Sequence, residues 1–438
     1  MNSQLFRART ILAALASLVG LCPAATAAEA LTLAEAQRRA VERSFQLPAQ
    51  DAAIAASREM ALAAGQLPDP VLTLGIDNLP IEGVDRFSLT RDFMTMRRIG
   101  VMQEITRIDK RRLRALRFES EAQKSLAEKT AVMASIQRET ALAWMERYYA
   151  EVLAAEVLQQ SSAVRLEIIA AESAYRAGRG SQADIFAAHG LLAALEDRKS
   201  EFQRRIATAT IGLARWIGPS AEAPLSGKPS IDRIRLNLAA LDQELAHHPD
   251  IAVLSRQMDL ASADARIAQA NKTADWSVEL NFAQRGPAYS NMVSIGVSVP
   301  LQWDQKNRQE RELGSRLALV EQARAQRDEL LRAHVAEVRA MVQEWENGRE
   351  RLARYQREII PLAGERTRAA LAAFRGGKAS LSDWLSARRG EIDSRIESLQ
   401  LERETARLWA QLNYLFHDEA ALPATGGASA ALPTGVSK

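Results

Sequence analysis

Apolar and polar residues alternate with a period of two in short segments of both halves of the chain. Segment 72–76 alternates leucine and isoleucine with threonine and glycine, and segments 278–282 and 293–299 alternate in the same way. This pattern predicts β-strands that have one apolar and one polar face. We expect four strands, at about residues 70–79, 98–106, 276–283 and 292–300.

After each pair of strands the apolar period becomes that of a helix. No glycine or proline occurs between Val101 and Ala177, and Leu142, Met145 and Tyr149 are spaced by three and four residues. A helix rises about 1.5 Å per residue, so we expect an element on the order of 100 Å long. The spacing favours packing of the coiled-coil type. In the second half, proline 361 predicts a kink in the equivalent helix.

The two halves of the chain repeat one sequence unit. The segment AYRAGRGSQADIF (174–186) is similar to AAFRGGKASLSDWL (372–385). The segment LTLAEA (31–36) is similar to LNLAAL (236–241). Such self-similarity predicts a duplicated structural unit. We divide the chain into a first repeat at residues 29–225 and a second repeat at residues 226–421, each with two strands followed by long helices.

The longest match between the repeats predicts the tip of a helical hairpin in each, at residues 178–184 and 377–383. A glycine ends the incoming helix in the left-handed conformation, and a serine caps the outgoing helix. An aspartate three residues after the serine completes a capping box. These residues are Gly178, Ser181 and Asp184 in the first repeat and Gly377, Ser380 and Asp383 in the second.

The two ends of the chain differ in composition from the repeats. Residues 1–28 have a basic start, an apolar run and a small-residue cleavage site, which predicts a secretory signal peptide. A buried N-terminal helix is the alternative interpretation, and Cys22 leaves lipid attachment open. The tail at residues 422–438 is predicted to be disordered.

Charge and motif content exclude several classes of function. The formal charge is +3, and it falls to +1 when the two arginines of the signal peptide are removed, so no nucleic-acid partner is expected. About a quarter of the residues are charged, which suits long solvated helices. The chain has no P-loop, nucleophile elbow or zinc-helix motif. We therefore expect no enzyme activity, no catalytic residue and no cofactor.

Two groups of residues could suggest a metal site. His247 and His248 precede a helix start, and no partnering histidine or cysteine lies near them in the sequence, which favours a structural role. Met94, Met96 and Met102 carry thioethers that suit Cu(I) or Ag(I), but their positions beside and within a strand favour packing. We therefore predict no metal site.

Four strands are too few to close a membrane barrel, because the smallest such barrels have eight. If the strands lie in a membrane, several chains must pool them, since unpaired strand edges are not satisfied in lipid. Two hairpins that cap a soluble helical bundle are the alternative. In the membrane case the fourth strand points Ile295, Val297 and Val299 towards lipid and Ser294, Gly296 and Ser298 towards the lumen.

The order of signal peptide, duplicated strand–loop–strand–helix–tip–helix unit and tip motif resembles the TolC-like outer-membrane efflux proteins over about residues 31–416. The segments LPDPVLTLGIDNLP (67–80) and DFMTMRRIGVMQE (92–104) are most similar to the heavy-metal branch, which is CzcC-like and CusC-like. The resemblance implies a mainly α fold with a membrane β-barrel portion. Three chains would pool twelve strands into one barrel above a periplasmic helical tunnel.

The resemblance also implies a function and partners. The protein would be a homotrimer in the outer membrane of a Gram-negative bacterium, in contact with outer-membrane lipid. It would form the exit duct of a tripartite RND-type efflux system, with a periplasmic adaptor (membrane fusion protein) and an inner-membrane RND pump. The branch implies heavy-metal cations such as Cu/Ag or Co/Zn/Cd as substrates. Drug efflux or type I protein secretion is the alternative, followed by a periplasmic coiled-coil adaptor or scaffold.

The family's tip residues can be assigned on this sequence. Six tips would form the periplasmic mouth of a trimer, and the aspartates Asp184 and Asp383 would ring its aperture. Some family members carry a second aspartate where this chain has Ser386, so their strong carboxylate ring is not expected here. The residues expected to dock the adaptor are Gly178, Arg179, Gly180, Ser181, Gly377, Lys378, Ala379 and Ser380.

Overall fold

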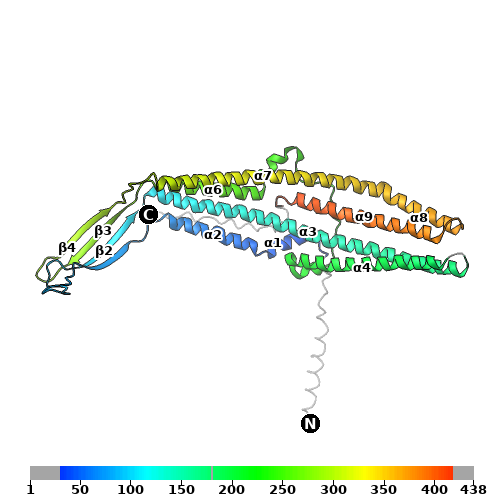
Figure 1. Cartoon of the computed structure of the whole chain (residues 1–438), viewed down its shortest axis with the longest axis horizontal. Helices are drawn as coiled ribbons and strands as arrows, with labels where there is room; N and C mark the ends of the chain where they lie inside the picture. The colour runs from blue at the N-terminus through cyan, green and yellow to red at the C-terminus, as the bar shows by residue number, and fades with distance from the viewer. Residues whose placement is uncertain (1–29, 179–180, 418–438) are drawn as a thin grey trace, which may run out of the picture.

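A computed structural model describes residues 30–178 and 181–417 of the chain. The molecule is long and narrow, with a small sheet at one end and helices that extend away from it (Figure 1). The predicted signal peptide with Cys22, the tip residues Arg179 and Gly180, and the tail at 422–438 lie outside the described residues.

The sheet contains four antiparallel strands in the order β1-β2-β3-β4. Each strand overlaps a segment in which the alternation predicted it. The second strand begins earlier than expected because Met96 still pairs with Asp77, and the fourth ends before Pro300, which has no amide proton to donate. The strands are β1 Val71–Asp77, β2 Met96–Ile105, β3 Trp276–Gln284 and β4 Met292–Ser298.

Long helices make up most of the described chain. The longest, α3, has 69 residues and so a length of about 100 Å. It extends from the sheet to the opposite end of the molecule (Figure 1). The first repeat contains α1 Leu33–Arg43, α2 Gln46–Ala64, α3 Ile108–Arg176, α4 Gln182–Ile217 and the short helix η1 Gly218–Glu222. The second contains η2 Leu238–Ala240, α5 Leu241–Leu245, α6 Pro249–Ala270, α7 Gln309–Arg354, η3 Tyr355–Ile359, α8 Ile360–Arg375 and α9 Leu381–Asn413.

One turn of π-helix, η3, lies where Pro361 predicted a kink. Proline has no amide proton, and its ring crowds the carbonyl one turn earlier in an α-helix. A wider turn relieves this crowding without ending the helix. Helices α7 and α8 therefore follow each other through η3, and Pro361 lies in the first turn of α8.

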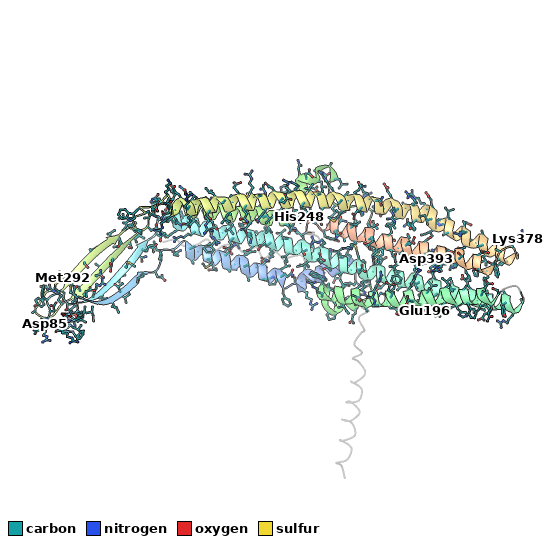
Figure 2. All side chains as sticks on the ribbon, in the orientation of Figure 1. Asp85, Glu196, His248, Met292, Lys378 and Asp393 are labelled. Carbon is teal, nitrogen blue, oxygen red and sulfur yellow. The ribbon has the colours of Figure 1, made fainter. Side chains whose placement is uncertain are left out.

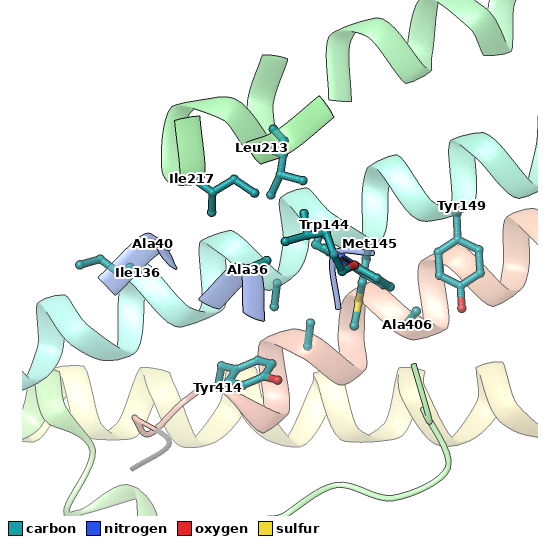
Figure 3. Packing of buried hydrophobic residues seen from close by; sticks show 14 of the residues in the cluster. Ala36, Ala40, Ile136, Trp144, Met145, Tyr149, Leu213, Ile217, Ala406 and Tyr414 are labelled. Carbon is teal, nitrogen blue, oxygen red and sulfur yellow. Dashed lines mark hydrogen bonds between the residues drawn. The ribbon is translucent and has the colours of Figure 1, made fainter. Parts of the chain in front are cut away.

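The main hydrophobic core lies midway along the helices, where α1 packs against α3 and α4 and residues of α9 join the same cluster (Figure 3). Trp144 is fully buried, and its indole nitrogen donates a hydrogen bond to the carbonyl of Leu31 at 3.2 Å. Trp345 donates in the same way to the carbonyl of Ile231 at 3.1 Å. Each tryptophan thus ties the first segment of its repeat to a long helix.

Candidate conduit and helix-hairpin tips

One face of the sheet is apolar and exposed, and we call it the apolar face. Leu74 and Ile295 expose 73% and 74% of their surface, although a soluble protein would bury such residues. The strand register aligns apolar side chains of all four strands in two cross-strand rows, those of Leu74 and Ile295, and the same face also carries Arg97, Gln103 and Gln284. The apolar face comprises Leu72, Leu74, Ile76, Ile99, Val101, Leu280, Phe282, Val293, Ile295 and Val297.

The opposite face of the sheet, called here the polar face, carries charged and amide side chains. The guanidinium of Arg98 lies 3.2 Å from the carboxylate of Asp77 and 3.8 Å from that of Glu279, so one arginine links β1, β2 and β3. The side chain of Asn281 is buried against Gly100, where an added Cβ would lie 1.9 Å from its Oδ1. Glycine at position 100 therefore makes room for this asparagine.

The two loops at the end of the sheet farthest from the helices pack against each other. Arg285 donates a hydrogen bond to the carbonyl of Phe93 at 2.9 Å. A Cβ at Gly286 would lie 1.9 Å from the carbonyl oxygen of Thr90, so the backbones approach closely there. The loop between β1 and β2 is thereby fixed to the loop between β3 and β4.

A buried ion pair joins the sheet to the helices at its other end. The ammonium of Lys110 on α3 lies 2.8 Å from the carboxylate of Asp275, which directly precedes β3. The same carboxylate accepts a hydrogen bond from the amide of Arg107 at 3.0 Å. Burial raises the pKa of Asp275, but the Lys110 and Arg107 contacts outweigh it and hold the pKa below its usual value. The first residues of α3 are thus linked to the start of β3.

The first hairpin tip has the predicted local structure. Gly178 follows α3 with a φ of 72°, which is the left-handed conformation expected for it. Ser181 caps α4 and accepts a hydrogen bond from the amide of Asp184 at 3.2 Å. The carboxylate of Asp184 in turn accepts from the amide and the hydroxyl of Ser181, at 3.0 and 2.8 Å.

The second tip repeats this arrangement. Gly377 has a φ of 69°, and the amide of Lys378 donates to the carbonyl of Ala373 at 2.8 Å. The carboxylate of Asp383 accepts from the hydroxyl and amide of Ser380, and these two hydrogen bonds hold the pKa of Asp383 below its usual value. Lys378 is exposed at the end of the molecule opposite the sheet, and Ala379 is half-buried (Figure 2).

The two tips differ in the aromatic residues next to them. Phe374 stacks on Trp384 with ring centroids 6.4 Å apart, and Trp384 is 6% exposed. The corresponding Tyr175 of the first tip is 47% exposed. The second tip is therefore fastened to its outgoing helix by an aromatic pair, whereas the first presents its aromatic ring to solvent.

A buried ionic cluster between the two hairpins was not predicted. Arg388 on α9 contacts Glu167 on α3 at 3.3 Å, Gln160 at 2.7 Å and Glu391 at 3.0 Å. Burial raises the pKa of Glu167, and Glu391 adds to this effect while Arg388 opposes it. No local motif marks this cluster, because its partners are 221 residues apart in the sequence.

The structure brings a second histidine to His248, which corrects the expectation from the sequence that none lies nearby. The ring of His334 on α7 lies 4.2 Å from that of His248, and His247 is exposed instead. Burial, and then the neighbouring His334, lower the pKa of His248 to about 4. Within residues 30–178 and 181–417, no group of three or more histidine, cysteine or acidic side chains could hold a metal ion.

The described part of the chain contains no helix that is both long and apolar enough to cross a membrane.

No protein-family model matches the chain, and no curated protein matches it either. Solved structures do match. The outer-membrane protein VceC from Vibrio cholerae has a TM-score of 0.72 at 19% identity, over 87% of this chain and 95% of VceC. The outer-membrane channel OprN has 0.73 at 18%, over 88% and 90%. CusC, described as forming a transmembrane channel, has 0.73 at 15%, over 88% and 92%.

The chain has the fold of these channels. The predicted fold class is therefore confirmed: the described chain is mainly helical with four antiparallel strands, and it matches TolC-like folds that have a helical tunnel and a barrel to which strands contribute. OprN and CusC match with equal TM-scores, so the fold likeness favours neither of them.

Proposed function

We propose that the protein is an outer-membrane channel that forms the exit duct of a tripartite RND-type efflux system in a Gram-negative bacterium. It carries substrates from the periplasm to the exterior and catalyses no reaction. The observation that carries the proposal is the four-stranded sheet, whose apolar face is exposed along every strand. Lipid is the solvent in which such a surface is stable.

Closure of the barrel requires further copies of the chain. Within the described residues, β1 pairs only with β2 and β4 only with β3, so both edges of the sheet carry unpaired backbone groups. Such edges cannot lie in lipid. Two chains would already supply the minimum of eight strands, and it is the resemblance to the TolC-like proteins that implies three chains, which join β4 of one copy to β1 of the next into twelve strands. The protein is therefore proposed to be a homotrimer.

The opposite end of the molecule is proposed to meet the periplasmic adaptor, which links the duct to an inner-membrane RND pump. Gly178 and Gly377 both face open space among the described residues, where no heavy atom beyond their own chain neighbours lies within 4 Å of the position of a Cβ. The carboxylates of Asp184 and Asp383 serve the caps of their own helices while remaining at the tips. In the trimer these aspartates would surround the periplasmic aperture and favour cations.

Heavy-metal cations are the proposed substrates. The support is the resemblance of segments 67–80 and 92–104 to the heavy-metal branch, together with the charge of the polar face. That face carries three carboxylates, Asp77, Glu104 and Glu279, against the guanidinium of Arg98, which leaves a net charge of −2 per chain. Drug efflux remains the second candidate, since the fold likeness to these channels does not distinguish one substrate class from another.

Membrane fractionation tests the proposal. The full chain, expressed with its own residues 1–28 in a Gram-negative host, should be recovered in the outer membrane as a detergent-resistant trimer. After purification it should conduct ions across a planar lipid bilayer. Recovery as a soluble periplasmic monomer would contradict the proposal and favour the coiled-coil scaffold instead.

A further inference from the structure

Three methionines project from the polar face of the sheet rather than from the apolar face. On β2, the residues that face the apolar side are Ile99 and Val101, so Met96 and Met102 share the opposite side with Arg98. On β4, Met292 lies in the same cross-strand row as Arg98, because both residues pair with Ala283 on β3. Methionine is an apolar residue, and its position on this face therefore calls for a reason.

Core packing does not supply that reason. None of these three methionines belongs to the buried hydrophobic clusters of the described chain, whereas Met145 lies in the main one. Met292 is 50% exposed, and Met96 and Met102 are half-buried. Their thioethers are thus on the surface that would line the lumen of the proposed channel.

The methionines lie at both ends of the polar face. Met102 is in the row of Glu279 and Gly296, nearer the helices, and Met96 pairs with Asp77 at the loop end. Met292 also lies at the loop end (Figure 2). Met96 and Met102 are six residues apart along β2, which corresponds to about 20 Å in an antiparallel strand. A trimer would carry three copies of each methionine around the lumen.

We propose that these methionines are contact sites for soft monovalent cations, Cu(I) and Ag(I), on their way through the lumen. This inference rests on the proposed function and names its substrate class. Thioether sulfur is a soft ligand, which selects Cu(I) and Ag(I) over harder ions such as Co(II). Separate sites with few ligands bind an ion weakly enough for it to leave, as conduction requires.

The charges beside the thioethers are compatible with cation passage. The one guanidinium on the polar face, that of Arg98, is paired with Asp77 and Glu279. Its positive charge is therefore compensated next to Met292, which lies in the same row, and next to Met96, which lies in the following row of the polar face. The carboxylates attract any cation, and the sulfur atoms supply the preference for soft ones.

Single-channel recording of the purified full-length protein tests this proposal. Planar bilayers in potassium nitrate avoid silver precipitation, and micromolar silver nitrate is the probe. Ag⁺ should reduce the potassium current of the wild-type channel reversibly. The triple variant M96L/M102L/M292L should raise the half-blocking Ag⁺ concentration about tenfold or more, because leucine keeps the volume but has no sulfur. The block of each channel is scored against its own conductance without Ag⁺, and Co²⁺ should affect both channels alike.

The matched control adds a thioether to the other side of the same strand. Val101→Met lies on the apolar face, so it should leave the Ag⁺ response unchanged. A conducting channel whose Ag⁺ block is the same in the triple leucine variant would overturn the methionine sites and leave the proposed function intact. A wild-type protein that forms no pore would overturn the proposed function, and this inference with it.

Discussion

At the scale of single residues, the clearest constraints are at two kinds of glycine. Gly100 is needed for space, because a side chain there would occupy the position of Asn281 and Thr73. Gly178 and Gly377 are needed for backbone conformation, because both have a positive φ and open space around them. The two kinds of constraint predict different responses to substitution.

Gly100→Ala should weaken the sheet. The added methyl group would lie 1.9 Å from Oδ1 of Asn281 and 2.7 Å from Oγ1 of Thr73, so Asn281 must leave its place. Overpacking of this kind costs about 1–3 kcal/mol. Gly296→Ala is the matched control, since its nearest contact on the same face would be an ordinary 4.0 Å. Thermal dissociation of the proposed trimer should shift downwards for the first variant only, and equal shifts would argue against the packing explanation.

Two substitutions, Gly377→Asn and Gly377→Val, distinguish two roles of this glycine at the second tip. One role is its left-handed backbone conformation, and the other is the surface that it leaves free of a side chain. Asparagine tolerates the left-handed region, whereas a β-branched residue there is strained by about 1–2 kcal/mol. Limited proteolysis should therefore show a loosened tip for valine and an intact tip for asparagine. If the adaptor requires a bare glycine surface, both variants should lose efflux. An asparagine variant with full efflux would reject Gly377 as a docking residue.

At the scale of elements, signals within a few residues of each other were sufficient to predict structure. The period of two located the strands, and the glycine, serine and aspartate of each tip predicted its caps. Contacts between segments that are far apart in the sequence could not be predicted from local signals. The contact of His248 with His334 and that of Arg388 with Glu167 are examples. The face on which Met96 lies was not available from the sequence, because the strand was predicted to begin at residue 98 and β2 begins at Met96.

The junction between the sheet and α3 should be sensitive to pH. The pKa of Asp275 is lowered in the folded protein, so its ion pair with Lys110 stabilises the fold above the unfolded pKa of about 3.9. That stabilisation is lost as the pH falls through the lower folded pKa. Asp275→Asn should cost about 1.5–3 kcal/mol at neutral pH, since it removes a charge-assisted hydrogen bond.

Thermal unfolding of Asp275→Asn and the wild type at pH 7 and pH 3 measures this contribution. The difference between the two proteins should shrink at the lower pH, where the carboxylate of the wild type begins to bind a proton. Asp109→Asn, next to Lys110 on α3, provides the control, because Asp109 and its partner Arg107 are both exposed. An unchanged difference between pH 7 and pH 3 would assign the effect to hydrogen bonding alone.

At the scale of the whole molecule, one helix connects the two surfaces on which the proposed function depends. Helix α3 begins beside the sheet at the Lys110 ion pair and ends at the first tip. Its middle part packs in the main core, and its last turns pack against α4 and α9. The sheet and the first tip are therefore connected by one continuous element.

The orientation of the sheet in the membrane gives the most direct test at this scale. Ile295 and Ser294 are neighbours on β4 and point to opposite faces, and Ile295 is 74% exposed in the single chain. An arginine on the lipid-facing side near the bilayer midplane costs about 2–4 kcal/mol, whereas one in a water-filled lumen costs little. Ile295→Arg should therefore lower the amount of trimer recovered from the outer membrane, and Ser294→Arg should insert normally. Ser294→Arg should instead reduce conductance, because it adds a positive charge to a cation-conducting lumen. The reverse result, with Ser294→Arg failing to insert, would place the polar face towards lipid and contradict the proposed channel.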